Sequence, residues 1–433
     1  MSYKVNDLMY AAGEGILNTI RTDITFTEPV NKEVLESATN AAAERFPYFC
    51  VKLLQRGEEY VMEHNSEPFA VSRGSVGAPL GSAQNNHHLF SVTYENDTIY
   101  IHTSHFITDG RGIFPFIRTL VYLYLHELHP DEEFDMAHID LPGSAIPSEE
   151  ADSDPYPDEL LPCAPIIDTK RPRDILKLGD LHEESGSNGY TSFRIAVKQK
   201  ELMRYLSSVD GSPATFITSV MYKAIAELHR GEELPVVCGM QHQFRNALGK
   251  PFSHNCHVNI VPMVYPNRLR DRDIETLNTI SRGMLLLRAS DENDILTINA
   301  NIRNRKHIEA LDLMKKHRFM RKVLLKGIGS NTFEVSYTGR VYWCGLDKYI
   351  KGVAPYIDLS LSGGLSVEIF TVGDIFDINI MQRGSTTRYF DRFCELLTGC
   401  GVSFVTQGAC RFELCGFVLP EQITYRQHRT TTA

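Results

Sequence analysis

A long acidic connection divides this sequence into two separately patterned halves. Residues 130–160 hold eleven Asp and Glu and five Pro, with no Lys or Arg, and a polar run follows at residues 183–189. Acidic, proline-rich segments are typical of loops, so we expect this stretch to lie outside the core. We place the connection at residues 130–189, between an N-terminal lobe over residues 1–175 and a C-terminal lobe over residues 190–433.

The length and composition agree with a folded protein of more than one lobe. A chain of 433 residues is too long for one ordinary core. Its composition of 42% hydrophobic, 10% aromatic and 23% charged residues is that of a folded protein with a sizeable buried core. The sequence has no apolar run of the length that a membrane span needs, and its start lacks the order of a signal peptide. We therefore expect a cytoplasmic protein.

Charge and cysteine usage exclude several function classes. The net charge is −10 and no Lys/Arg cluster is visible, which argues against a nucleic-acid partner. The nine cysteines are odd in number and form no C-x-x-C, so we expect free thiols. His254, Cys256, His257 and the cysteines of the last forty residues are the only metal-ligand types grouped in sequence, and their spacing is irregular. We expect no metal.

Hydrophobic periodicity predicts a mixed α and β protein. Apolar residues at helical spacing predict helices at residues 31–45, 112–128, 199–207, 215–228 and 386–397. Short β-type runs predict strands at residues 59–62, 89–93, 97–104, 190–197, 235–239, 258–265, 333–341 and 365–370. Because these elements do not alternate strictly as βαβ, we expect an α+β fold in which each lobe is a mostly antiparallel or mixed sheet flanked by helices.

One histidine occupies a position suited to chemistry. His105 follows the apolar strand at residues 97–104 and precedes Asp109 and Gly110, where a tight turn leads into the next helix. An imidazole exchanges a proton near neutral pH, and a buried carboxylate can lock a loop by pairing with a distant arginine. From its position alone, a structural histidine at a strand end is the favoured interpretation of His105.

Several segments together resemble one superfamily. Residues 105–110 read HFITDG, which is similar to the His-x-x-x-Asp-Gly signature of chloramphenicol acetyltransferase, plant BAHD acyltransferases, mycobacterial polyketide-associated acyltransferases and peptide-synthetase condensation domains. Three other segments extend the resemblance over both halves of the chain. Residues 45–49 are similar to the end of the family's first helix, residues 243–249 followed by Asn255 to its Arg-containing segment, and residues 333–340 to its late strand.

The resemblance implies an architecture and a set of residue roles. It implies two lobes of like fold that meet at a channel, with two substrates entering from opposite faces. His105 matches the general base, Asp109 a structural carboxylate, and Gly110 the turn glycine. Arg245 matches the partner of Asp109, and Ser336 is a candidate donor to the oxyanion.

The resemblance also implies an activity. It predicts an acyltransferase that moves an acyl group from a coenzyme A or other pantetheine thioester to an alcohol or amine. Acyl-coenzyme A would be a co-substrate, with no permanently bound cofactor, and the partners would be a small-molecule acceptor and the thioester. Two alternatives remain: a stand-alone condensation domain whose donor arrives on a carrier protein, and a non-catalytic binding protein of the same fold.

Overall fold

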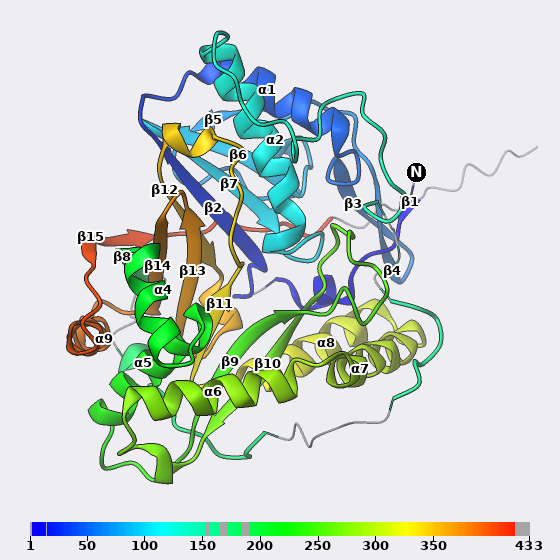
Figure 1. Cartoon of the computed structure of the whole chain (residues 1–433). Helices are drawn as coiled ribbons and strands as arrows, with labels where there is room; N and C mark the ends of the chain where they lie inside the picture. The colour runs from blue at the N-terminus through cyan, green and yellow to red at the C-terminus, as the bar shows by residue number, and fades with distance from the viewer. Residues whose placement is uncertain are drawn as a thin grey trace, which may run out of the picture.

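Two sheets form the centres of two lobes, stacked one above the other in the computed structural model (Figure 1). The structure describes residues 2–13, 15–151, 154, 156–163, 171–183 and 190–420. The polar run at residues 184–189 of the predicted connection lies outside these described residues.

The sheet of the N-terminal lobe takes one strand from the second half of the chain. Its order is β12 (Ile350–Ile357), β2 (Thr19–Phe26), β7 (Thr98–Ser104), β6 (Phe90–Glu95) and β5 (Ser72–Arg73). All neighbours are antiparallel except β5 and β6. Helices α1 (Lys32–Arg45) and α2 (Gly110–Leu128) pack against each other over this sheet (Figure 1). A hairpin of β3 (Val51–Arg56) and β4 (Glu59–His64), extended by β1 (Ser2–Tyr3), stands beside it.

The sheet of the C-terminal lobe has seven strands of mixed direction. Its order is β10 (Val258–Tyr265), β9 (Val236–Gln243), β11 (Phe333–Tyr337), β13 (Leu365–Val372), β14 (Ile375–Arg383), β8 (Tyr190–Lys198) and β15 (Val405–Phe412). Strand β11 runs parallel to both of its neighbours, and the other pairs are antiparallel. The lobe's helices include α4 (Gln199–Ser208), α5 (Pro213–Leu228), α6 (Ile274–Arg288) and α9 (Arg388–Gly399).

The two faces of this seven-stranded sheet differ in polarity. Phe333 and Val335 of β11 belong to the apolar core that includes helix α5. Because side chains alternate along a strand, Glu334 and Ser336 lie on the opposite face, and Glu368 of β13 faces the same way. Strand β12 packs against β13 and β14. The second face of the sheet therefore lies toward the N-terminal lobe and is lined by polar groups.

Two helices of the second half extend to the N-terminal lobe. Helices α7 (Asp291–Glu309) and α8 (Leu313–Ile328) follow α6 directly, and none of the three was predicted from the sequence. Lys316 of α8 lies 3.7 Å from the carboxylate of Glu59, and His317 Nε2 lies 3.1 Å from the hydroxyl oxygen of Tyr60. Helix α8 therefore contacts the β3–β4 hairpin of the other lobe.

Most of the predicted elements are confirmed, with shifted ends. The helix predicted at residues 31–45 begins with Asn31, whose side chain accepts a hydrogen bond from the backbone of Val34 at 3.2 Å. The strand predicted at residues 258–265 is β10. The strand predicted at residues 333–341 is wrong beyond Tyr337, since pairing with β13 ends there and Gly339 adopts a φ of 86°.

The acidic connection is partly buried, which corrects the expectation that it lies outside the core. Tyr156 is 7% exposed and joins an apolar cluster with Phe244 and Ile298. Glu150 accepts a hydrogen bond from Arg45 at 2.9 Å. An aromatic side chain and a carboxylate thus hold the connection to the two lobes, which the composition of the segment did not reveal.

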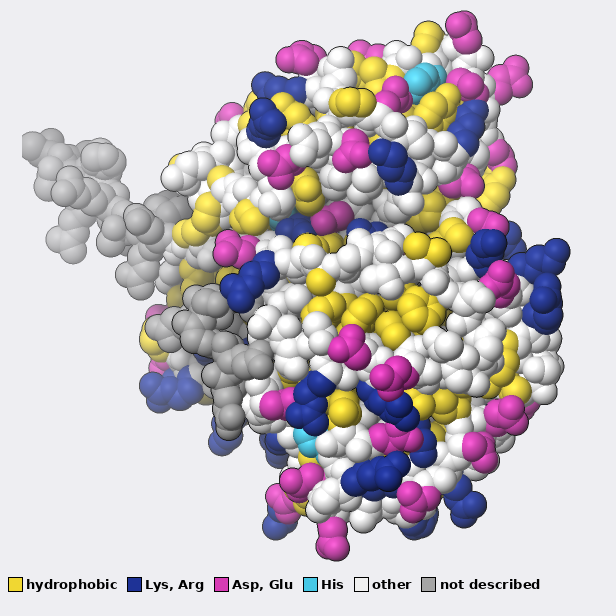
Figure 2. Space-filling model, turned by 90° about the vertical axis from the view of Figure 1, so that its left-hand side faces the viewer, with side chains coloured by type: hydrophobic (Ala, Val, Ile, Leu, Met, Phe, Trp, Pro, Cys, Tyr) yellow, Lys and Arg dark blue, Asp and Glu magenta, His cyan; other side chains and the backbone are white. Residues whose placement is uncertain are grey.

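The nine cysteines are all free thiols, as the sequence predicted. Within the described residues, no helix combines the length and hydropathy that crossing a membrane requires. Figure 2 shows acidic and basic side chains interspersed over one face of the molecule, so this face presents no continuous basic surface.

The first prediction concerns a glycine close to the start of α2. A Cβ at Gly112 would lie 2.2 Å from the carbonyl oxygen of His254 and 2.4 Å from the hydroxyl of Thr108. Gly112→Ala should therefore destabilise the protein by about 2 kcal/mol or more, as overpacking against backbone does. The control is Gly283→Ala in α6, where a Cβ meets nothing within 4 Å, and there alanine should stabilise by about 0.5–1 kcal/mol.

Thermal unfolding of the two variants measures this difference. The Tm of Gly112→Ala should fall and that of Gly283→Ala should rise slightly. Equal Tm values for the two variants would show that the backbone around His254 yields to accommodate the methyl group.

Candidate active site

His105 lies in the turn between β7 and α2 with a defined orientation. Its backbone N–H donates to the carbonyl oxygen of Asn18 at 2.7 Å, and its Nδ1 lies 3.1 Å from the carbonyl oxygen of Thr108. A carbonyl oxygen can only accept, so Nδ1 carries the proton in this contact. The neutral ring therefore keeps its basic lone pair on Nε2.

A thiol from the other lobe contacts the same ring. Cys256 Sγ lies 3.6 Å from Nδ1 of His105, and Cys256 is 3% exposed. Burial lowers the pKa of His105, but Cys256, the carboxylate of Asp109 and the Thr108 carbonyl raise it more, and the resulting pKa is about 9. These neighbours therefore favour the protonated form of the ring.

Asp109 begins helix α2 and is saturated with hydrogen bonds. Its Oδ1 accepts from the backbone N–H of Gly112 at 2.9 Å, and its Oδ2 from that of His257 at 2.8 Å. Arg245 donates from Nη2 to Oδ1 at 2.8 Å, and both side chains are 1% exposed. Burial alone would raise the pKa of Asp109, but Arg245 and the two N–H donors hold it below its ordinary value.

Arg245 also binds the loop that carries Cys256. Its Nε donates to the carbonyl oxygen of Ser253 at 2.7 Å, and its Nη2 to that of Asn255 at 2.7 Å. The structure thus brings together two of the residues that the sequence singled out, Asp109 and Arg245. Their contact joins the turn that bears His105 to a loop of the C-terminal lobe.

Gly110 and Ser336 occupy different surroundings. Gly110 is the first residue of α2, and a Cβ there would meet only the side chain of Thr338, at 3.7 Å. The close approach at this turn falls instead on Gly112, which the sequence did not single out. Ser336 is 9% exposed, and its side chain is hydrogen-bonded to the carboxyl group of Glu368.

Two buried carboxyl groups that were not predicted lie beside Ser336. Glu368 accepts from Ser366 Oγ at 3.2 Å, and Glu334 accepts from Asn331 Nδ2 at 2.9 Å. Burial raises the pKa of both carboxyl groups to about 7. Both residues interrupt otherwise apolar strand patterns, FEVSY and LSVEIF, and this interruption is the signal that could have identified them from the sequence.

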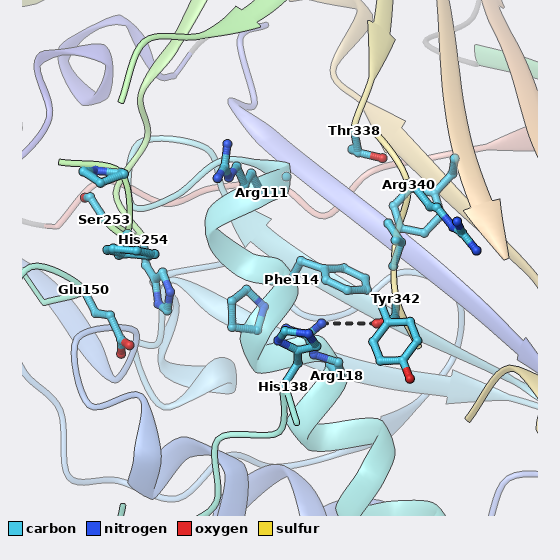
Figure 3. Close-up of a pocket in the computed structure, with 16 residues that line it drawn as sticks. Arg111, Phe114, Arg118, His138, Glu150, Ser253, His254, Thr338, Arg340 and Tyr342 are labelled. Carbon is cyan, nitrogen blue, oxygen red and sulfur yellow. Dashed lines mark hydrogen bonds between the residues drawn. The ribbon is translucent and has the colours of Figure 1, made fainter. Parts of the chain in front are cut away.

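Two pockets are lined by segments that adjoin this region in the chain. The first, which we call the α2 pocket, has a volume of about 460 Å³ and the second, the α8 pocket, about 240 Å³. The α2 pocket is lined mainly by the start of α2 and by the segments around residues 251–254 and 338–342 (Figure 3). The α8 pocket is lined by α7, α8, the start of β10 and residues 6–8.

Two segments of the chain each run from one pocket toward the other, and His105 contacts one of these two segments. Ser253 and His254 line the α2 pocket, residues 258–260 line the α8 pocket, and Cys256 between them contacts His105. The second segment is β11 with its flanking residues. Thr338, which follows β11, lines the α2 pocket, and Asn331, which precedes β11, is bound by Arg171 of the α8 pocket. That contact runs from Arg171 Nη1 to Asn331 Oδ1 at 2.6 Å.

Within the described residues, no group of three or more His, Cys, Asp or Glu side chains is arranged to hold a metal ion. Cys256 and His257, grouped in sequence with His254, have separate contacts. Cys256 faces His105, whereas Nε2 of His257 lies 3.0 Å from the hydroxyl of Ser253.

The fold is shared with solved structures despite low sequence identity. No protein-family model and no curated protein sequence matches the chain. F. graminearum TRI101, solved with coenzyme A and deoxynivalenol, is 10% identical with a TM-score of 0.58, over 92% of this chain and 97% of that one. The first condensation domain of the CDA synthetase is 12% identical with a TM-score of 0.57, over 94% and 99%. Polyketide synthase associated protein 5 from Mycobacterium tuberculosis is 10% identical with a TM-score of 0.56, over 92% and 96%.

These likenesses cover nearly the whole of each chain, so they concern both lobes and their arrangement. The protein has the two-lobed fold of these solved structures, with mixed sheets flanked by helices as the sequence predicted. At such identities the likeness establishes the fold, and the chemistry must be argued from the site.

The second prediction concerns the buried ion pair. Asp109→Ala or Arg245→Ala leaves one buried charge without its partner, which typically costs about 3–5 kcal/mol. Because both substitutions remove the same contact, the double variant should lose clearly less stability than the sum of the single losses. The matched control is Lys351→Ala, which removes an exposed ion pair with Asp97 and should cost less than about 1 kcal/mol.

Unfolding of the four variants under one set of conditions tests this coupling. Additive losses from Asp109→Ala and Arg245→Ala would mean that the two residues stabilise the fold independently, contrary to their contact.

Proposed function

We propose that this protein transfers an acyl group from a coenzyme A or similar pantetheine thioester to an alcohol or amine, with His105 as general base. The proposal rests on one observation: His105, whose Nδ1 is directed to Thr108, contacts Cys256, and Cys256 lies in the chain between residues that line the α2 pocket and residues that line the α8 pocket. A histidine whose neutral ring has its lone pair on Nε2, next to a segment that borders two pockets, suits a reaction in which two substrates meet. The shared fold with TRI101, which was solved with coenzyme A, supports the same reaction class.

The proposed reaction needs no covalent enzyme intermediate. Nε2 of His105 would take the proton from the acceptor hydroxyl or amine as its oxygen or nitrogen attacks the thioester carbonyl. The tetrahedral intermediate would then collapse with cleavage of the C–S bond, and the imidazolium would return the proton to the departing thiolate. General base catalysis is worth about 10²–10⁴ in rate, and alignment of two bound substrates can add about 7–11 kcal/mol.

Asp109 and Arg245 would act as positioning residues in this scheme. Both carboxylate oxygens of Asp109 are held by Gly112, His257 and Arg245. A carboxylate so engaged has little capacity for proton transfer, and its pKa is lowered rather than raised. Its role would be to hold the turn that presents His105.

Ser336 remains the proposed donor to the developing oxyanion. In the structure its side chain is hydrogen-bonded to Glu368, so it would have to rotate to reach a substrate carbonyl. The raised pKa of Glu368 keeps part of this carboxyl group neutral near pH 7, which limits its repulsion of a nearby oxyanion.

The third prediction concerns the base itself. His105→Ala should lower turnover by about two to four decades without a comparable loss of stability. The assay offers a panel of acyl-coenzyme A thioesters of different chain lengths with mixed alcohol and amine acceptors and measures release of free thiol. The control is His126→Ala, at an exposed position near the end of α2.

Full activity in folded His105→Ala would contradict the mechanism. Absence of thioester turnover by the wild-type protein over the whole panel would instead favour the non-catalytic alternative.

The fourth prediction concerns pH. Because the base must be neutral and the pKa of His105 is raised to about 9, kcat/KM should increase with pH, reach half of its maximum near pH 9 and level off above it. Cys256→Ala removes one of the groups that raise this pKa, so the rising limb should move to lower pH. Profiles of kcat/KM for both proteins measure the shift, and coincident profiles would show that the thiol does not act on the ring.

A further inference from the structure

The two helices that line the α8 pocket differ in character. Helix α7 contributes Thr297, Asn301 and Asn304, which follow the i, i+4 and i+7 spacing of one helix face. Helix α8, which lies beside α7 (Figure 1), contributes apolar side chains. These are Met320, Val323, Leu324 and Ile328. The pocket therefore offers hydrogen bonds from one helix and an apolar surface from the other.

The side chain of Asn304 has no partner of its own in the fold. Helix α7 contains four asparagines, although asparagine is a weak helix former. Asn293 and Asn299 donate to backbone carbonyl oxygens at 2.8 Å, and Asn301 donates to the hydroxyl of Tyr156 at 2.9 Å. The side chain of Asn304 forms no hydrogen bond with any residue that the structure describes. Its amide lines the pocket and is free to bind a ligand.

The charged side chains of the pocket are engaged by the protein. Asp7 Oδ2 accepts a hydrogen bond from Nε of Arg305 at 3.3 Å, within an ion pair. Arg171 donates to the carbonyl oxygens of Gly327 at 3.0 Å and Ile260 at 2.9 Å, in addition to Asn331. A charged ligand would therefore enter without a free counter-ion, and burial of an unpaired charge is costly. The pocket favours an uncharged ligand.

The α8 pocket adjoins the candidate base and suits an acyl acceptor better than a thioester. Asn6 lines the pocket, and its Nδ2 donates at 3.4 Å to the carbonyl oxygen of Cys256, whose thiol contacts His105. Coenzyme A and carrier-borne pantetheine both carry phosphate, for which this pocket has no uncommitted cation. Its volume of about 240 Å³ lies below the range of about 300–1,000 Å³ that is usual for drug-sized ligands. The ligand should therefore be compact.

We propose that the α8 pocket binds the acyl acceptor and that this acceptor is a compact, uncharged alcohol. Its hydrocarbon skeleton lies against α8, and a second oxygen substituent is bound by Asn304. This inference rests on the proposed acyl transfer and narrows its acceptor from alcohols and amines in general to uncharged alcohols. An alkyl amine is an ammonium ion near neutral pH, and it would need a carboxylate that the pocket does not have free.

Turnover with matched alcohols tests the class of acceptor. Four cyclohexanols carry a hydroxyl, methyl, amino or carboxylate group at position 4 and receive the same acyl group from coenzyme A. The diol should have the highest kcat/KM, and the methyl compound should be about two- to tenfold poorer because one neutral hydrogen bond is lost. The amino and carboxylate compounds should be poorer than the diol by about tenfold or more.

Substitutions at Asn304 test the residue that makes this choice. Asn304→Leu should bring the ratio of kcat/KM for the diol and the methyl compound close to one. Asn304→Asp supplies a free carboxylate, so it should raise kcat/KM for the amino compound about tenfold or more. The matched control is Ala300→Leu, at an exposed position of α7 that lines neither pocket. It should keep the wild-type order of acceptors.

Binding of cyclohexane-1,4-diol alone tests the pocket without turnover. Saturation-transfer NMR should detect binding to the wild-type protein, and Asn304→Leu should weaken it about two- to tenfold. Displacement of the diol by pantetheine would show that the pocket holds the arm of the donor and would overturn the inference.

The outcomes separate this inference from the proposed function. Turnover that needs His105 but prefers the amino or carboxylate compound, or accepts none of the four alcohols, would overturn the assigned acceptor and leave acyl transfer standing. An unchanged order of acceptors in both Asn304 variants would also overturn it. Diol binding that depends on Asn304, without transfer from any thioester, would support the pocket and contradict the proposed function.

Discussion

The contact between Asp109 and Arg245 is the interaction on which the site depends. Each charge is almost completely buried, and each is compensated by the other and by backbone groups of the opposite lobe or its own turn. A lone buried charge would cost several kcal/mol, so the two segments are stable only together. One segment carries His105, and the other carries Cys256. The ion pair therefore joins the turn that carries His105 to the loop that carries Cys256.

The polar face of the seven-stranded sheet explains why the interface between the lobes can hold such groups. Strand β12 crosses this face, and its Pro355 carbonyl oxygen accepts from Asn379 at 2.9 Å. Nearby, Arg194 and Asp377 form an ion pair at 2.8 Å close to Gly352, where a Cβ would lie 3.1 Å from the carboxylate. An interface built from hydrogen-bonded polar groups can enclose ionisable side chains with shifted pKa values, because each has partners when the lobes meet.

Local patterns predicted the elements whose own sequences carry a strong signal. Helices α1 and α2 have regular apolar stripes and capping side chains, and β10 has a β-type run, so periodicity located them. Helix α7 escaped prediction because it lacks an apolar stripe and buries Asn293, Asp294 and Asn299 among its few apolar residues. The predicted strand at residues 333–341 ran too far because Thr338 and Val341 are β-type residues, whereas Gly339 between them turns the backbone and pairing with β13 ends at Tyr337.

The sequence by itself determined that the chain has two lobes of mixed structure, and its His-x-x-x-Asp-Gly segment and Arg245 pointed to the residues around which the site is built. Only the tertiary structure decided which nitrogen of His105 is basic, which thiol touches it, and that Glu334 and Glu368 are buried beside Ser336. It also decided that β12 completes the sheet of the other lobe and that Gly110, His254 and Thr338 line one pocket. The physical reason is distance along the chain: the Asp109–Arg245 pair spans 136 residues and the Cys256–His105 contact 151. Local periodicity records which face of an element is buried, whereas the partner on that face depends on how the lobes pack.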